Sequence, residues 1–178
     1  NHREKRKTGQ YTYYFSGGDT KHHHRAGVAI IIKNELVNYI EDVQPINERL
    51  MTITIKTIVP TTIIAVYAHT AQHELTEKQN LYKEIEEIHK KHKGKKITHI
   101  VGDFNARIQT KASEEEEVCI GKHTFDKNNI TLEKQDEQTE ENRQLFMDLC
   151  IGEKLTIMNT QFQKRDDQLA THRRPTNE

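Results

Sequence analysis

The stretch VGDFNARI (101–108) follows a short apolar run and places an aspartate and an asparagine two residues apart at the end of a predicted strand. Side chains alternate between the two faces of an extended chain, so Asp103 and Asn105 are expected on one side and Phe104 on the other. A carboxylate and a carboxamide that share a face at a strand end suit a functional site. The same residues also suit a simple turn, in which Gly102 relaxes the backbone and a side-chain oxygen caps it.

A second predicted strand ends in a similar way. The segment IIAVYAHT (63–70) is apolar up to Tyr67 and His69, which again stand two residues apart at its carboxyl end. Ligands of α/β sheets bind outside the carboxyl ends of the strands. The two strand ends therefore predict one pocket formed by Tyr67, Asp103 and Asn105.

Composition predicts a soluble globular domain with much solvated surface. The 178 residues are 33% hydrophobic and 30% charged, so the core must be concentrated in a few apolar segments. Lys plus Arg equals Asp plus Glu at 27 each, and net charge therefore gives no argument for binding a polyanion. Single charged runs are interpreted first as solvated surface, namely the basic runs at 3–7, 89–96 and 172–175 and the acidic run at 114–117.

The sequence favours an intracellular location, with the nucleus as one compartment. No apolar run approaches the roughly 20 residues that a membrane-spanning helix needs, and the first seven residues are polar and basic. Cys119 and Cys150 have no CxxC spacing and are interpreted as ordinary thiols, which suits a reducing compartment. We therefore expect no membrane partner.

The hydrophobic pattern mixes strands with helices. The run at 26–32 is continuous and β-branched, as expected of a strand buried on both faces, whereas alternation in 48–58 predicts a half-buried strand that pairs antiparallel with the next one. Thr76 and Gln79 have the spacing of a capping box. The stretch 110–138 is predicted to be a polar surface insertion. Further strands are expected at 11–15, 62–68, 97–101, 155–160 and, more weakly, 168–173, and helices at 76–93 and 140–152.

Other polar residues carry weaker hypotheses. The tract KHHHR (21–25) and the pair His89 and His92 are interpreted as surface features rather than metal ligands. Arg49 precedes an alternating strand, where it either pairs with a carboxylate near the site or forms a salt bridge at the strand edge. Both interpretations of Arg49 stay open at the level of sequence.

In its motifs the chain resembles the endonuclease/exonuclease/phosphatase superfamily. Within that superfamily it is most similar to the apurinic-type endonuclease domain of LINE-like (RTE-type) retrotransposons and of craniofacial development protein 2-like proteins. GDFNA is the most specific single motif. The occurrence of all the motifs in the same order as in the family is stronger evidence for the resemblance than any one motif. The series spans nearly the whole chain: RAGVAIIIK (25–33), ERL (48–50), IIAVYAHT (63–70), VGDFNARI (101–108), ENRQLFMDLC (141–150), LTIMNTQF (155–162) and THRRP (171–175). The resemblance implies a four-layer α/β sandwich, in which two mixed sheets lie between helices.

The resemblance also implies roles for individual residues. Asp103 would orient and deprotonate the attacking water, and Asn105 would hold the scissile phosphate and its transition state. Tyr67 would donate to developing charge near the phosphate, and Asn142 matches a family asparagine of the same site. The resemblance further implies a strand that lies against the substrate, formed here by Thr171, His172 and Arg173.

The implied cofactor is Mg²⁺ or Mn²⁺. A hard divalent cation is held by a few carboxylates together with phosphate oxygens, and it neutralises the charge of the phosphoryl group. Asp103 is a candidate ligand. The family's main magnesium ligand is a glutamate on a strand that would precede residue 1, and its catalytic histidine lies in a Ser-Asp-His segment that would follow residue 178.

We therefore expect residues 1–178 to form a single partial domain, with an incomplete sandwich and little or no hydrolytic activity of its own. A smaller departure from the family is His69, which stands where the family usually has proline and loosens the loop after Tyr67. The expected function of the parent domain is Mg²⁺-dependent nicking of DNA at the target site of a retroelement, by a monomer. Two alternatives stay open: a phosphatase-type member of the same superfamily, and a non-catalytic retroelement remnant or interaction module, which the missing segments favour.

Overall fold

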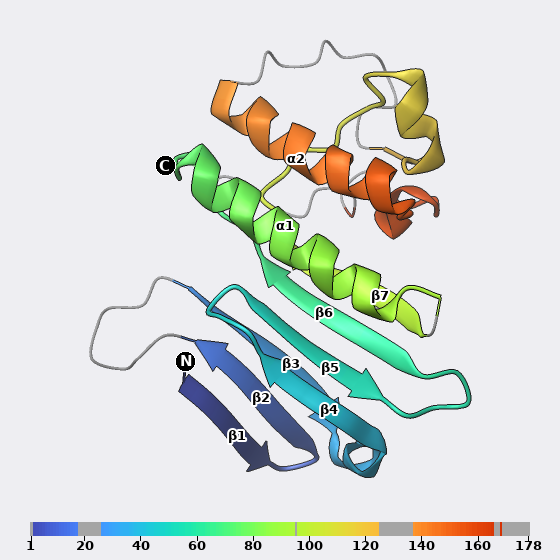
Figure 1. Ribbon diagram of the computed structural model, residues 1–178. Coiled ribbons are helices and arrows are strands. Elements are labelled where there is room, and N and C mark those ends of the chain that lie inside the picture. The colour runs from blue at the N-terminus through green and yellow to red at the C-terminus, as the bar shows by residue number, and fades with distance from the viewer. Residues whose placement is uncertain (1, 18–25, 95, 125–136, 166–167, 169–178) are drawn as a thin grey trace, which may run out of the picture. The chain divides into compact units, whose positions relative to one another are not determined.

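The computed structural model describes residues 2–17, 26–94, 96–124, 137–165 and 168 (Figure 1). These residues form two compact units, Asn1–Phe104 and Asn105–Glu178. The boundary falls inside the VGDFNARI motif, so that Asp103 belongs to the first unit and Asn105 to the second. Each unit is described by itself.

The first unit begins with a three-stranded antiparallel sheet in the order β1-β2-β3. Its strands are β1 (His2–Thr8), β2 (Tyr11–Gly17) and β3 (Gly27–Lys33). Burial alternates strictly along β3, where Ile30 is buried and Ile31 is 56% exposed. The prediction that this strand is buried on both faces is therefore wrong, because an antiparallel sheet can bury one face and leave the other solvated.

A four-stranded mixed sheet follows in the order β4-β5-β6-β7. β4 (Ile40–Pro45), β5 (Leu50–Ile55) and β6 (Thr61–Tyr67) are antiparallel neighbours, as the sequence predicted for the last two. β7 (Ile97–Asp103) pairs parallel with β6. Five of the six residues of β5 are buried, which corrects the prediction of a half-buried strand. The correction follows from its central position, since β5 contributes side chains to both faces of a covered sheet.

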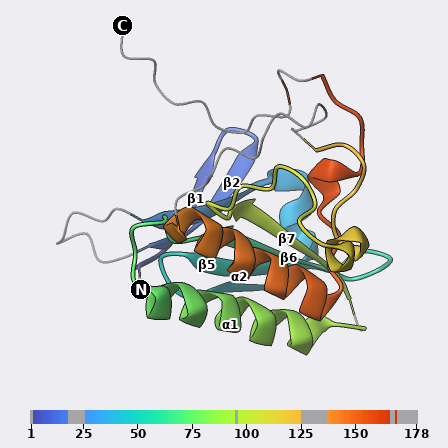
Figure 2. The ribbon, with the colours of Figure 1, turned by 90° about the horizontal axis from the view of Figure 1, so that it is seen from above.

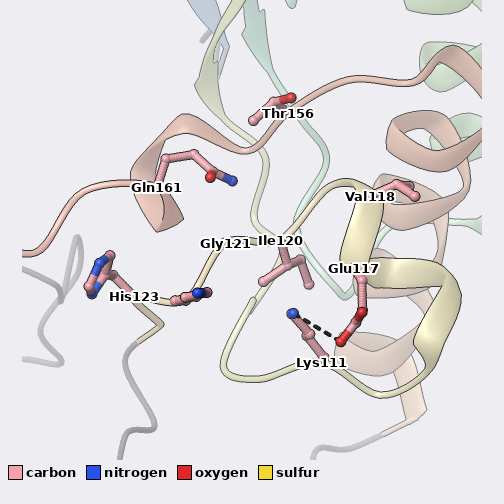
Figure 3. Close-up of a pocket in the computed structure, with 9 residues that line it drawn as sticks. Lys111, Glu117, Val118, Ile120, Gly121, His123, Thr156 and Gln161 are labelled. Carbon is pink, nitrogen blue, oxygen red and sulfur yellow. Dashed lines mark hydrogen bonds and ion pairs between the residues drawn. The ribbon is translucent and has the colours of Figure 1, made fainter.

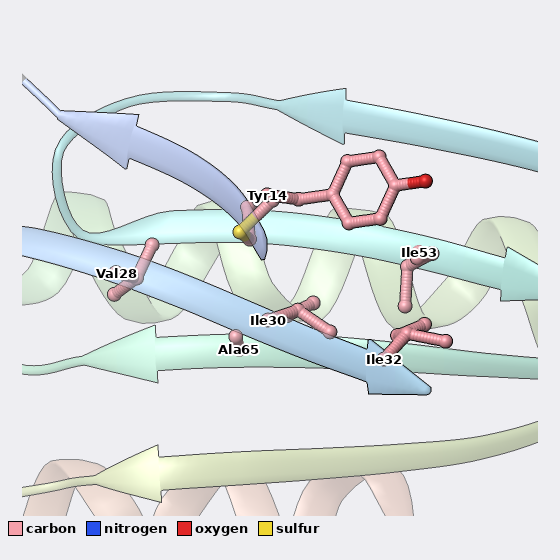
Figure 4. Close-up of a cluster of buried hydrophobic side chains, with 7 residues drawn as sticks. Tyr14, Val28, Ile30, Ile32, Ile53 and Ala65 are labelled. Atoms are coloured by element: carbon pink, nitrogen blue, oxygen red, sulfur yellow. The ribbon is translucent and has the colours of Figure 1, made fainter. Parts of the chain in front are cut away.

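The two sheets pack face to face through one hydrophobic core. The strands β3 and β5, and likewise β3 and β6, are in contact. Figure 4 shows the inward side chains, and the buried members of the cluster are Tyr14, Val28, Ile30, Ile32, Met51, Ile53 and Ala65. Each large aliphatic side chain buried here contributes about 1.5–3 kcal/mol. The predicted α/β class with two packed sheets is confirmed.

Helix α1 (Leu75–His92) connects β6 to β7 and lies along the second sheet (Figures 1 and 2). Leu81, Ile85 and His89 recur at a spacing of four and are buried. The surface interpretation of His89 is therefore wrong, because His89 continues the inward stripe of the helix. The predicted capping box is also absent: the helix begins one residue before Thr76, and its N-cap makes no side-chain hydrogen bond.

The second unit contains α2 (Glu137–Glu153) and two short 3-10 turns, η2 (Glu114–Val118) and η3 (Met158–Thr160). Its core is formed by Cys119, Ile120, Met147 and Cys150, and both cysteines are free thiols. Burial raises the pKa of the Cys150 thiol to about 12, consistent with the interpretation of an ordinary, unreactive thiol.

The strand predicted at 155–160 does not form. Ile157 makes one isolated parallel bridge with Ile120, and the chain then turns into η3. The Thr160 hydroxyl donates to the Ile157 carbonyl oxygen at 2.7 Å, a local bond that competes with a strand ladder. The predictions for the KHHHR tract (21–25) and for residues 169–173 of the weaker strand fall outside the described residues. Within the described chain, no helix is both long enough and apolar enough to span a membrane.

Candidate active site

Parallel pairing of β6 with β7 sets Tyr67 directly opposite Asp103, at the carboxyl ends of both strands. The Ala68 amide donates to the Asp103 carbonyl oxygen at 2.8 Å, which extends the pairing by one residue. Residues opposite each other in a sheet project from the same face, so the phenol and the carboxylate share a face. Tyr67 is half-buried against the core, and Asp103 is exposed. The first unit therefore brings together two of the predicted site residues.

The glycine before Asp103 is required by the backbone of β6. Gly102 has a φ of +147°, and a Cβ atom added to it would lie 1.8 Å from the Val66 carbonyl oxygen. No side chain fits at this distance, and the backbone conformation itself favours glycine. Gly102 thus allows β7 to pair with β6 up to the position of Asp103.

Arg49 adds a cation beside Tyr67. The guanidinium carbon of Arg49 lies 5.3 Å from the centroid of the Tyr67 ring, and Nη1 donates to the Tyr67 carbonyl oxygen at 3.3 Å. In return, the Tyr67 amide donates to the Arg49 carbonyl oxygen at 2.9 Å. In the described part of the chain Arg49 thus contacts an aromatic ring and a carbonyl, rather than the carboxylate that both sequence interpretations required. A cation over an aromatic ring is attracted by the negative face of the ring.

His69 stands two residues after Tyr67 and is neutral at pH 7. Its ring centroid lies 4.7 Å from that of His73, whose Nδ1 is 3.0 Å from the Thr70 hydroxyl. Burial, together with the nearby positive charges of Arg49 and His73, lowers the pKa of His69 from 6.5 to about 4. In the sequence His69 marks a strand end and stands where the family usually has proline, and nothing there indicated that it is half-buried.

In the second unit, Asn142 contacts the backbone of Asn105. The Asn142 amide nitrogen Nδ2 donates to the Asn105 carbonyl oxygen at 3.2 Å, and Asn142 is only 2% exposed. Asn105 has a left-handed backbone with a φ of +48°, a conformation that asparagine tolerates better than most residues. The strand ends at Asp103, so the alternation used to place Asn105 on the side of Asp103 does not extend to Asn105.

The predicted site residues are thus distributed over both units. Tyr67 and Asp103 lie together in the first unit, and Asn105 and Asn142 lie together in the second. The other predicted substrate-binding residues, Thr171, His172 and Arg173, fall outside the described residues.

A buried ion pair next to Asn142 was missed by the sequence analysis. Arg143 binds both carboxylate oxygens of Glu116, at 2.8 and 2.7 Å, and also donates to the Thr110 carbonyl oxygen at 3.1 Å. The side chains of both partners are 6% exposed. The acidic run at 114–117 is therefore not wholly solvated surface. The one available signal was the position of Arg143, four residues before the buried Met147 on a helical face.

The described residues fit a magnesium ion only in part. They contain no group of three or more His, Cys, Asp or Glu side chains that could hold a metal ion. Mg²⁺ often uses one or two carboxylates and completes its coordination with phosphate oxygens and water. Asp103 has the chemistry of one such ligand, and a complete site needs further groups.

Comparisons with known proteins neither support nor contradict the resemblance that the motifs suggest. The chain matches no protein-family model, no curated protein and no solved structure. Membership of the endonuclease/exonuclease/phosphatase superfamily stays a prediction.

Proposed function

We propose that the chain is part of a Mg²⁺-dependent phosphodiesterase domain that nicks DNA, in the manner expected of a retroelement endonuclease. The observation that carries this proposal is the position of Tyr67 opposite Asp103 at the carboxyl ends of two parallel strands. Such strand ends are where α/β sheets bind their ligands. The ordered motifs add support, because GDFNA supplies Asp103 and the earlier strand motif supplies Tyr67.

Each residue at these strand ends has a defined task in the proposal. The exposed Asp103 carboxylate accepts a proton from the attacking water or ligates the metal ion. The Tyr67 phenol donates to a phosphate oxygen, and the Arg49 guanidinium beside the ring favours an anion at this edge. When bound, Mg²⁺ would neutralise charge on the phosphate and activate water.

In the second unit, Asn142 acts through Asn105. Its bond to the Asn105 carbonyl fixes the backbone of the residue that the motif assigns to the phosphate. The buried pair of Arg143 with Glu116 holds the neighbouring residues 110–116 against α2. Asn142 and Arg143 are thus positioning residues, whereas Asn105 is the residue expected to contact substrate.

Plasmid nicking tests the proposal. The assay uses the longest polypeptide that the encoding reading frame supports, with supercoiled DNA and Mg²⁺. We expect Asp103→Asn to lower the nicking rate by about 100-fold or more, the usual scale for loss of a general base. Asp42→Asn is the matched control, because Asp42 is an exposed carboxylate on β4 of the same unit, and its rate should stay within about twofold of wild type. Equal nicking by Asp103→Asn and wild type would refute the role of Asp103.

The same preparation separates the two alternatives. Hydrolysis of a phosphomonoester such as p-nitrophenyl phosphate without plasmid nicking would favour the phosphatase-type function. A folded polypeptide that hydrolyses neither substrate, with Mg²⁺ or with Mn²⁺, would favour the non-catalytic interaction module. The proposal expects nicking of DNA and little hydrolysis of the phosphomonoester.

A further inference from the structure

The second unit contains a groove of about 520 Å³ between residues 118–123 and 156–161 (Figure 3). We propose that this groove binds the phosphodiester backbone of duplex DNA. The inference rests on the proposed function, for which it names a contact surface outside the predicted catalytic residues. The polar and charged residues that line the groove are Lys111, Glu117, Lys122, His123, Thr156 and Gln161.

The two walls of the groove are fastened to each other by backbone hydrogen bonds. The Ile157 amide donates to the Cys119 carbonyl oxygen at 2.9 Å, and the His123 amide donates to the Thr160 carbonyl oxygen at 3.0 Å. The Gly121 amide donates to the Thr160 hydroxyl at 2.7 Å. A groove held in this way binds a ligand without first having to order its walls, which lowers the entropic cost of binding.

Gly121 shows how closely the walls approach. A Cβ atom at this position would lie 2.3 Å from the Thr160 carbonyl oxygen. Any side chain at residue 121 would therefore push the two walls apart. Lys122 and His123 follow Gly121 directly on the same wall, and the His123 amide is bonded to the Thr160 carbonyl oxygen of the other wall.

The charges that line the groove favour an anion. Lys111 and Glu117 form an ion pair with their side-chain atoms 3.4 Å apart, which Figure 3 marks with a dashed line. Lys122 and His123 are further described residues of the groove lining, and they belong to no such pair with Glu117. Thr156 and Gln161 offer neutral hydrogen-bond donors. Cationic and neutral hydrogen-bond donors are the groups that proteins use for phosphate oxygens of DNA.

The lining also indicates which form of nucleic acid fits. Single strands are bound mainly by stacking of bases on aromatic side chains. Among the described lining residues there is no Phe, Tyr or Trp, and the apolar ones are Val118 and Ile120. A groove with hydrogen-bond donors and, among its described lining residues, no large aromatic side chain suits the regular phosphate backbone of a duplex.

A DNA-binding assay on the 178-residue chain tests the inference. Fluorescence anisotropy measures the affinity for a labelled duplex of about 20 base pairs in the absence of Mg²⁺. Lys122→Gln should weaken binding about 3–10-fold and make the slope of log K against log salt shallower by about 0.9, the value for one lost phosphate contact. Lys122→Arg should retain the wild-type affinity. The matched control is Lys154→Gln, an exposed lysine of the same unit outside the groove, whose affinity should stay within about twofold of wild type.

Several results would overturn the inference. One is an unchanged affinity and salt slope in the double variant Lys122→Gln/His123→Gln. Another is tighter binding of single-stranded DNA than of duplex DNA. The third is the absence of DNA binding by the wild-type chain. Thermal unfolding of every variant is measured alongside, and rescue by Lys122→Arg separates lost charge from lost folding. Because no step of this assay cleaves DNA, its failure is distinguishable from failure of the nicking test on Asp103.

Discussion

Gly102 lies against the backbone of Val66, with no space between them for a Cβ atom. Gly102→Ala should therefore lower the free energy of unfolding by about 3 kcal/mol or more, through a steric clash combined with a strained φ. Urea denaturation measures the change. Gly27→Ala is the control, because a Cβ atom there would meet the Ser16 carbonyl oxygen at an ordinary 3.9 Å. Similar losses in both variants would contradict the close approach of β7 to β6.

His69 predicts a pH dependence of stability. Its pKa is lowered from 6.5 to about 4 in the folded chain, so between these values the unfolded state binds a proton that the folded state does not. Stability linked to His69 is therefore complete above pH 6.5 and is lost as the pH falls toward 4. Urea denaturation at several pH values should show a weaker dependence over this window for His69→Gln than for wild type. Identical pH profiles would contradict the presence of a half-buried, neutral His69.

Single residues differ in how well the sequence predicts their environment. Tyr67 and Asp103 were predicted to lie together, because strand ends can be recognised from apolar runs and meet at one edge of a parallel pair. Glu116 was taken for solvated surface because its partner Arg143 stands 27 residues later. A long-range ion pair leaves no periodic signal in the chain.

At the level of elements, the sequence predicts where helices and strands form better than it predicts how many faces of each are buried. The helix α1 and the strands β2, β3, β5, β6 and β7 were predicted close to their observed bounds. β1, with the sequence HREKRKT, was missed because it contains no apolar residue and joins the sheet through its backbone pairing with β2. The burial of β3 and of β5 was predicted the wrong way round, because the number of covered faces depends on neighbouring elements rather than on the strand itself.

The contact between η2 and α2 should depend on the buried pair of Arg143 with Glu116. Arg143→Ala leaves the Glu116 carboxylate buried without its cation, and we expect a loss of about 3–5 kcal/mol in urea denaturation. Lys111→Ala breaks the ion pair with Glu117, which is far more exposed than the pair of Arg143 with Glu116, and should cost less than about 1 kcal/mol. Equal losses would contradict a structural role of the buried pair.

The same pair adds a dependence on acid. Burial raises the pKa of Glu116, but the hydrogen bonds from Arg143 and from the Ala112 amide outweigh burial, and the pKa lies below its ordinary value of 4.5. The contribution of the carboxylate to stability is therefore complete above pH 4.5 and is lost as the pH falls below that value. Glu116→Gln should remove this part of the acid sensitivity.

At the scale of the whole molecule, the boundary between the two units falls inside the motif VGDFNARI (101–108), which contains Asp103 and Asn105. The strand and helix periods of the sequence predicted the α/β class, the family resemblance implied two packed sheets, and both are observed. It did not predict a unit boundary between Phe104 and Asn105, since no linker or change of composition marks it.

The central claim is that Asp103, held opposite Tyr67, acts in the cleavage of a phosphodiester. The most direct measurement is single-turnover cleavage of a duplex by the longest available polypeptide, with DNA affinity determined in parallel for wild type and Asp103→Asn. We predict a cleavage rate lower by about 100-fold or more with an affinity within about threefold of wild type. Cleavage at the wild-type rate by Asp103→Asn would contradict the claim.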